Sequence, residues 1–309
     1  MVFLGLGLGT VASGALLWVS GVAPAELWRA SRGSHVGSIH RPDDVIGYVL
    51  RPGASFRHRQ AQFDVVYRVD DGGTRRIPGP SDGRPRVLVL GDSWTFGHGV
   101  EDGEAYPARL QALWPDLGVR NLGVMGYGPA HVLLALERAL GATDDVALVL
   151  YGWTPIHLAR AYLRRSHLDT TAGHRVPRLE IENGRLVVEG LAGRDEAIDD
   201  AAPGLVRAEW VRTVAAVERM RDDCAAYGVR FLLVLLPGPD AIPVFDTDTR
   251  RMRRRMRRAG VEMVDLQRGR ASPKGDELFF EDDGHPTARW HRLVADAIAA
   301  RLDPPVAHR

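Results

Sequence analysis

Hydrophobic and polar positions change their pattern twice along the chain. Residues Met1 to Ala25 carry no charged side chain and interleave Leu, Val, Phe and Trp with Gly and Ala. A polar stretch punctuated by Pro and Gly follows, from about Ser31 to Pro85. From Arg86 onward short apolar runs alternate with helical stretches, which predicts a parallel sheet covered by helices on both faces. The runs expected to form its strands are Arg86–Leu90, Val119–Leu122, Ala147–Tyr151, Arg230–Leu236 and Val261–Leu266.

The stretches between these runs carry the spacing of amphipathic helices. From Val206 to Ala226 apolar side chains recur at steps of three and four, the period of a helix that buries one face. A second amphipathic helix is expected from about Ala288 to Leu302. Sheets of this kind place their sites beyond the carboxyl ends of the strands. The residues directly after each apolar run are therefore the ones to examine for chemistry.

The apolar N-terminus has the length of a membrane segment. As a helix, Met1 to Ala25 would run roughly 37 Å, enough to cross the hydrocarbon core. Two alternatives stay open: a cleaved signal peptide, because Ala23-Pro24-Ala25 fits a small-x-small site, and a buried helix. We expect a membrane-anchored protein with an extracytoplasmic body, in the periplasm or at the cell surface. Its orientation stays open, because the first basic residues, Arg29 and Arg32, follow the apolar run and favour a cytoplasmic body.

Two hairpins are expected outside the sheet. Residues Asp64 to Val69 look like a strand, and Ile46 to Gln60 supplies its partner. Asn183-Gly184 lies between two alternating runs, a strong hairpin signal, in a long stretch that follows the third strand. We therefore expect three parts: residues 1–25 as a transmembrane or signal-anchor segment, 26–85 as a β-rich lead-in, and 86–309 as an α/β domain with an inserted hairpin region at about 156–205.

Composition and charge narrow the class of protein. The 309 residues are 45% hydrophobic and 26% charged, enough to bury a sizeable core. The formal net charge of +1 provides no overall attraction for nucleic acid, and no such partner is expected. Cys224 is the single cysteine, so no disulfide can form within the chain, and it suits a buried helix position. With no Cys pair, no His-Glu-x-x-His and no Gly-x-x-x-x-Gly-Lys segment, neither a metal nor a cofactor is expected.

Candidate chemistry begins at the end of the first apolar run. There Gly91-Asp92-Ser93 can hold a serine at a tight strand-to-helix turn, with its hydroxyl exposed and its backbone N–H facing a developing oxyanion. A plain Asp/Ser helix cap is the alternative. The C-terminal block favours the first, because a serine hydroxyl needs a base, and His285 stands just before the last helix. Asp282, three residues earlier, can accept the other imidazole N–H; Asp283 suits a solvated neighbour.

These blocks carry a family resemblance. Gly91-Asp92-Ser93 together with Asp282-x-x-His285-Pro286 resembles the SGNH, or GDSL, hydrolase superfamily. The resemblance spans about Arg86 to Leu302 and implies a flavodoxin-like three-layer α/β fold. It assigns Ser93 as nucleophile, His285 as base and Asp282 as the residue that orients it. A further block after the second strand, Asn121 to Gly126, is similar to the family's second block, which implies that the Gly126 N–H joins that of Ser93 at the oxyanion.

One block departs from the family's pattern. The family has Gly-x-Asn-Asp after the third strand, and its Asn side chain completes the oxyanion hole. This chain has Thr154 in the Asn place and Pro155 in the Asp place. A Thr hydroxyl can donate one hydrogen bond but is shorter than an amide, and Thr154 is a candidate third donor. His157 is the other candidate for this task, although a polar group at a helix start is its simpler interpretation.

The resemblance implies an esterase, or an O-acetyl transferase or deacetylase of glycans if the body faces outside the cytoplasm. The expected partners are a small-molecule ester or an O-acylated glycan, and the membrane through the N-terminal segment. The competing class is a non-catalytic glycan-binding or envelope-assembly protein of the same fold, which the missing Asn favours. Seven arginines between Arg250 and Arg258 suit a solvated helix face better than a contact with anionic lipid or acidic polysaccharide.

Overall fold

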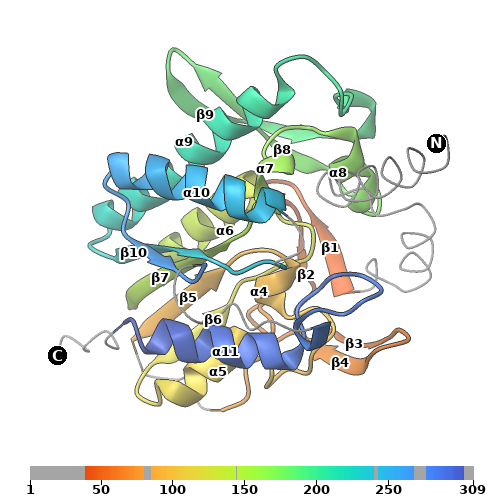
Figure 1. Cartoon of the computed structure of the whole chain (residues 1–309), viewed down its shortest axis with the longest axis vertical. Helices are drawn as coiled ribbons and strands as arrows, with labels where there is room; N and C mark the ends of the chain where they lie inside the picture. The colour runs from red at the N-terminus through yellow and green to blue at the C-terminus, as the bar shows by residue number, and fades with distance from the viewer. Residues whose placement is uncertain (1–38, 80–84, 144, 240–242, 268–275, 303–309) are drawn as a thin grey trace, which may run out of the picture.

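A parallel sheet of five strands forms the centre of the molecule (Figure 1). The computed structural model describes residues 39–79, 85–143, 145–239, 243–267 and 276–302. Across the sheet the strands follow the order β11-β10-β7-β5-β6, which is the flavodoxin-like order 2-1-3-4-5 read from the β6 edge. The predicted parallel sheet is confirmed. Its strands are β5 (Arg86–Leu90), β6 (Gly118–Asn121), β7 (Val146–Trp153), β10 (Arg230–Leu235) and β11 (Met263–Asp265).

Helices cover both faces of the sheet, so the expected three layers are present (Figure 1). Successive strand side chains point to opposite faces. On β5, Val87 and Val89 therefore pack with the helices of one layer, while Leu88 and Leu90 pack with those of the other. Burial on both faces is the reason that the strands read as unbroken apolar runs. The helices of the first layer are α5 (Tyr106–Leu113) and α11 (Ala288–Ala299), and those of the second include α6 (Pro129–Gly141), α9 (Leu205–Ala226) and α10 (Pro243–Arg258).

Two antiparallel hairpins precede the sheet. Strand β1 (His40–Asp43) pairs with β2 (Gly47–Leu50), and β3 (Ser55–Arg59) pairs with β4 (Asp64–Arg68). The second pair is the hairpin expected from the sequence. Tyr48 on β2 and Tyr67 on β4 are buried in the main hydrophobic core, so the hairpins pack against the sheet domain.

A further hairpin lies between β7 and α9. Strand β8 (Val176–Glu182) pairs with β9 (Arg185–Ala192), and the turn between them is Asn183-Gly184, with positive φ at both residues, as expected for this hairpin signal. Arg212 of α9 donates to the Leu179 carbonyl oxygen, which fastens the hairpin to the helix. The same region contains α7 (Ile156–Ala159), α8 (Arg165–Thr170) and the 3₁₀ turn η1 (Arg194–Glu196).

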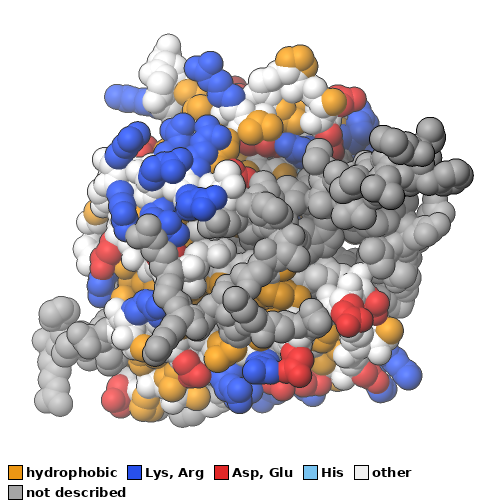
Figure 2. All heavy atoms as spheres, in the orientation of Figure 1, with side chains coloured by type: hydrophobic (Ala, Val, Ile, Leu, Met, Phe, Trp, Pro, Cys, Tyr) orange, Lys and Arg blue, Asp and Glu red, His pale blue; other side chains and the backbone are white. Residues whose placement is uncertain are grey.

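The arginine run lies on α10 (Pro243–Arg258), the helix before β11. Figure 2 shows basic side chains gathered over this helix. Arg251 and Arg255 lie over the Trp210 ring, with guanidinium carbons 4.3 and 5.9 Å from its centroid. Arg253 pairs with Asp265. Part of the run therefore packs against its neighbours, and the exposed remainder forms a charged helix face.

The expected membrane segment, residues 1–25, lies outside the described residues. Among the helices that the structure does describe, none is long and apolar enough to cross a bilayer.

Candidate active site

Ser93 stands at the turn between β5 and α4 (Ser93–Phe96). A Cβ on Gly91 would lie 2.1 Å from the Thr95 Oγ1, so the turn requires glycine there. Asp92 caps the helix, because its Oδ1 accepts a hydrogen bond from the Trp94 N–H (3.0 Å). The Ser93 N–H donates to no acceptor among the described residues. Ser93 thus combines a helix-start backbone donor with a hydroxyl at the carboxyl edge of the sheet.

His285 lies directly against this hydroxyl. Its Nε2 is 2.9 Å from the Ser93 Oγ, although the two residues are 192 positions apart in sequence. Its loop runs from the 3₁₀ turn η2 (Asp276–Leu278) to α11 and is closed by a hydrogen bond from the Phe280 N–H to the His285 carbonyl oxygen (2.8 Å). The structure therefore brings together the serine and the histidine that the sequence singled out.

The carboxylate beside His285 belongs to Asp283 and not to Asp282, which corrects the expected geometry. The Asp283 Oδ2 lies 3.3 Å from the His285 Nδ1, and its Oδ1 accepts a hydrogen bond from the His285 N–H (3.0 Å). Such an Asp side chain bonded to the N–H two residues on is an Asx turn, and it folds the carboxylate back onto the ring. Asp282 is exposed, and its N–H donates to the Gln62 side chain (3.1 Å).

A second histidine, His98, contacts the same carboxylate. Its Nε2 lies 3.0 Å from the Asp283 Oδ2, and its ring stacks on that of His285 with 4.0 Å between centroids. Burial and the neighbouring His285 lower the pKa of His98 to about 4, so it is neutral at pH 7 and donates a hydrogen bond. Burial opposes the ionisation of Asp283, but His285 and His98 hold the pKa of this carboxyl well below its usual range. Sequence reasoning missed His98, although it lies between two glycines only five residues after Ser93.

The same three side chains are the kind that can bind a metal ion. Ligand atoms of His98, Asp283 and His285 lie within 4.8 Å of one another. In the structure these atoms already interact with each other, which accounts for the cluster without a metal.

The loop after β6 carries Gly126 and lies beside the Ser93 turn, because the Val124 N–H donates to the Gly91 carbonyl oxygen (3.2 Å). Gly126 has φ +82°, and a Cβ there would lie 2.6 Å from the Tyr48 hydroxyl, so only glycine suits the position. The loop is fixed on both sides: the Tyr48 hydroxyl donates to the Met125 carbonyl oxygen (3.0 Å), and the His167 Nε2 donates to the Gly126 carbonyl oxygen (3.0 Å). Within the described residues, the Gly126 N–H has no acceptor. It is therefore a second backbone donor without a partner.

The block after β7 does not place its two predicted donors at the surface. Thr154 and His157 are both fully buried. The Thr154 hydroxyl has no hydrogen-bond partner among the described residues. His157 bonds through Nδ1 to the Tyr151 hydroxyl (2.9 Å), and its Nε2 lies 3.3 Å from the Asp92 Oδ2.

Arg160, which sequence reasoning also missed, completes this part of the site. Its Nη1 donates to the Asp92 Oδ2 (2.8 Å) and to the Tyr127 carbonyl oxygen (3.1 Å). Burial would raise the pKa of Asp92, but His157, Arg160 and the Trp94 N–H hold it well below its usual range. Asp92 is thus a buried, charged anchor directly beside the Ser93 turn.

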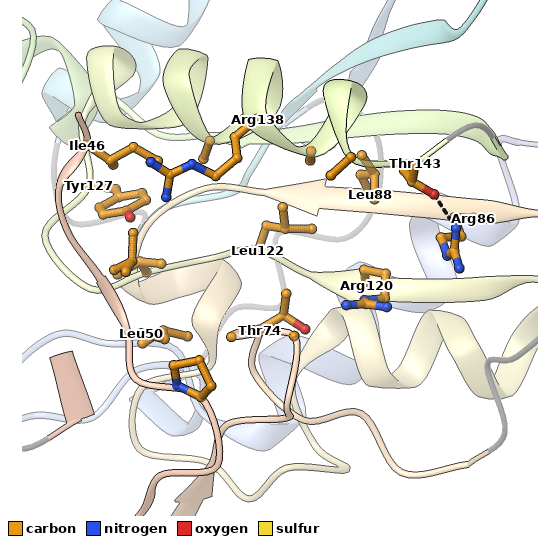
Figure 3. Close-up of a pocket in the computed structure, with 18 of the residues that line it drawn as sticks. Ile46, Leu50, Thr74, Arg86, Leu88, Arg120, Leu122, Tyr127, Arg138 and Thr143 are labelled. Carbon is orange, nitrogen blue, oxygen red and sulfur yellow. Dashed lines mark hydrogen bonds between the residues drawn. The ribbon is translucent and has the colours of Figure 1, made fainter. Parts of the chain in front are cut away.

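A cavity of about 400 Å³ lies elsewhere, between β2, α6 and the β5–β6 edge of the sheet (Figure 3). Arg86, Arg120 and Arg138 line it together with aliphatic side chains. Arg86 bonds to the Thr143 hydroxyl, and Arg138 pairs with Asp43 (2.8 Å). The lining includes neither Ser93 nor His285, although Val124 and Tyr127, from the loop after β6, belong to it.

No family model matches the chain, and no curated protein matches it. Solved structures to which it is similar include members of the GDSL and SGNH families. One is TesA (17% identity, 72% of this chain and 99% of that one, TM-score 0.48). Another is the psychrotrophic esterase EstA from Pseudoalteromonas sp. (14% identity, 70% and 95%, TM-score 0.44). A third is a member of the lipolytic protein G-D-S-L family from Veillonella parvula DSM 2008 (11% identity, 70% and 97%, TM-score 0.43).

Proposed function

We propose that the chain is a serine-dependent ester hydrolase. The contact of 2.9 Å between the Ser93 Oγ and the His285 Nε2 is the observation that carries this proposal. Such a contact lets the imidazole take the hydroxyl proton as the oxygen attacks. Asp283, on the other side of the ring, holds the tautomer that leaves Nε2 free to accept.

The reaction follows from these positions. Ser93 Oγ bonds to the ester carbonyl carbon while its proton moves to the His285 Nε2, and the carbonyl oxygen becomes an oxyanion. The unpartnered N–H groups of Ser93 and Gly126 are suited to hold this oxyanion. Collapse of the intermediate expels the alcohol, which takes the proton back from His285. Water then releases the acyl group by the same steps in reverse.

The substrate is an O-acylated small molecule or glycan, with transfer of an acetyl group to a second alcohol as a variant of the same chemistry. In that variant an alcohol takes the place of water in the second half of the reaction. A membrane anchor at residues 1–25 would hold the enzyme at the extracytoplasmic face of the membrane. The chain itself offers this support: an apolar run of sufficient length for a membrane helix.

A second candidate is a non-catalytic binding protein of the same architecture. Thr154 favours it, because a buried hydroxyl stands where the resembled family has its Asn donor.

A fluorophosphonate that labels active serines distinguishes the hydrolase from the binding protein. We expect one adduct, mapped to Ser93 by peptide mass spectrometry, and none in Ser93→Ala. Asp282→Asn is the matched control and should label like the wild type. An unlabelled wild-type protein that also lacks turnover of acetyl esters above the Ser93→Ala background would exclude the hydrolase.

A further inference from the structure

The segment after β7 does not supply the third oxyanion donor that was expected from it. An oxyanion hole built only from the Ser93 and Gly126 N–H groups has two donors, and the two side chains expected to add a third, Thr154 and His157, are both fully buried. His157 is also occupied by Tyr151 and Asp92. A side chain that donates to a substrate oxygen must reach the open part of the site.

Two contacts hold Arg160 between the loops that follow β5 and β6. One goes to Asp92, the residue directly before Ser93, at 2.8 Å, and the other to the carbonyl of Tyr127, the residue directly after Gly126, at 3.1 Å. Both contacts use the same nitrogen, Nη1. The guanidinium therefore joins the segment that contains Ser93 to the segment that contains Gly126.

Arg160 also retains free donors. A guanidinium carries five N–H bonds, and the two on Nη1 account for the observed contacts. Nε and Nη2 donate to no acceptor among the described residues, and the side chain is 18% exposed, unlike Thr154 and His157. Three N–H groups are thus available on a cation that Asp92 keeps in position.

We propose that Arg160 is the third oxyanion donor, in the place of the Asn side chain of the resembled family; this rests on the proposed hydrolase function. As the Ser93 Oγ bonds to the carbonyl carbon, the π electron pair of the carbonyl moves to its oxygen, and the Ser93 proton moves to His285. The negative charge that develops there receives a charge-assisted hydrogen bond from Arg160. When the intermediate collapses, the charge leaves with the alcohol oxygen, which is protonated by His285.

Three variants test the assignment with 4-nitrophenyl acetate, a neutral ester that Arg160 cannot bind through a substrate charge. Arg160→Met should lower kcat on the order of a hundredfold with little change in KM, because a donor used only in the transition state is lost. Arg160→Lys keeps a charged donor and should retain about tenfold more kcat than Arg160→Met. Arg138→Met is the matched control: it breaks another arginine–aspartate pair, at 2.8 Å to Asp43, and should leave turnover within about twofold of the wild type.

Arg160 also pairs with Asp92, so loss of structure must be separated from loss of a donor. Arg160→Ala assayed with guanidinium ion at tens of millimolar provides this readout: rescue of kcat is expected for a donor, and a merely structural role gives none. Unchanged kcat in Arg160→Met overturns the inference, as does a loss of kcat that follows a lowered Tm without rescue. A rise in KM confined to anionic esters overturns it too, in favour of substrate recognition. If wild type and Ser93→Ala turn over the ester equally, the proposed function fails instead.

Discussion

At the scale of single residues, the carboxylate beside His285 is set by a turn and not by spacing along the chain. Asp283 Oδ1 bonds to the His285 N–H, and its Oδ2 faces the ring, whereas Asp282 points to solvent. Asp283→Asn keeps the shape but removes the charge and allows the wrong tautomer of His285. We expect kcat to fall by roughly 10³ to 10⁴. Asp282→Asn should stay within about twofold, and the reverse result would assign the role to Asp282.

His98 gives Asp283 a second hydrogen bond, so we expect it to position that carboxylate. His98→Leu removes the donor and leaves the Oδ2 with His285 alone; kcat should fall roughly tenfold while KM changes little. His98→Gln, whose amide can still donate, should recover most of the loss. Steady-state kinetics of the two variants measures kcat and KM, and Tm checks that both variants are folded. Equal activity of His98→Leu and the wild type would show that His285 alone suffices to hold Asp283.

The residues that sequence reasoning identified and those that it missed differ in a physical way. Ser93 directly follows the first predicted strand and His285 shortly precedes the last predicted helix, so the pattern of strands and helices indicates where to look for them. His98 and Arg160 follow α4 and α7, two helices of only four residues that no periodic pattern indicates, and their contacts depend on partners from distant parts of the chain. Asp282 and Asp283 both lie close enough to His285 in the sequence for their carboxylates to reach its ring. The sequence favoured Asp282, but the Asx turn between Asp283 and the His285 N–H selects Asp283.

At the scale of elements, the hairpin β3–β4 forms a wall of the site rather than only a lead-in. The rings of His58 and Phe63 lie 5.0 and 5.5 Å from that of His98, and the Tyr67 hydroxyl accepts a hydrogen bond from the Gly99 N–H (2.8 Å). The same hydroxyl bonds to His58 at 2.9 Å. The hairpin therefore encloses the loop that carries His98, a contact that no local sequence pattern indicates.

Removal of that hydroxyl tests the connection. Tyr67 is fully buried, so Tyr67→Phe leaves the Gly99 N–H without its acceptor, and we expect the free energy of unfolding to fall by about 1 to 3 kcal/mol. Turnover should fall as well, because the His98 loop loosens. Tyr227→Phe is the matched control, since Tyr227 is 60% exposed and should change stability by less than about 0.5 kcal/mol. Denaturant unfolding of both variants measures the difference. Equal free energies of unfolding for the two variants would show that the Tyr67 hydroxyl does not stabilise the loop that carries His98.

The hydrophobic pattern alone does not predict where a strand begins and ends. The run Val261–Leu266 was expected as a strand, but β11 covers only Met263–Asp265. Val261 donates instead to the Met256 carbonyl oxygen (2.9 Å) and so completes the end of α10, although its side chain is as buried as a strand residue. Apolar character predicts burial at such a position, whereas the hydrogen-bond partner decides which element it belongs to.

At the scale of the whole molecule, the alternation of strands and helices was enough to predict the parallel sheet and its two helical layers. Parallel strands need crossover connections, and the helices that make them must cover the sheet faces. The strand order places β5, which leads to Ser93, next to β6 and β7, the strands whose loops carry Gly126 and Arg160. The carboxyl ends of these three strands are neighbours at the point where the strand order reverses. Segments that are far apart in the sequence therefore lie close together there.

The molecule also buries histidines in a neutral form, and this predicts how it responds to acid. Burial is the largest cause that lowers the pKa of His98 to about 4 and those of His167 and His291 to about 3, and it holds that of His131 well below its usual value. The unfolded chain takes up protons at these histidines below about pH 6.5, the ordinary value for the side chain. The folded chain does not do so until the pH reaches the lowered values.

Between about pH 6.5 and 4 the unfolded state thus binds more protons, so the free energy of unfolding must fall as the pH is lowered. Each histidine contributes up to about 1.4 kcal/mol per pH unit in this window, so the group can remove several kcal/mol between pH 6 and 5. Denaturant unfolding at pH 7.5, 6 and 5 measures the slope. In His291→Asn the amide oxygen can replace the Nδ1 that accepts the Tyr106 N–H (3.2 Å). One histidine fewer then titrates, so the free energy of unfolding should depend less steeply on pH, by the equivalent of about one proton. A wild-type stability that stays constant from pH 7.5 to 5 would mean that these histidines become protonated within the folded protein.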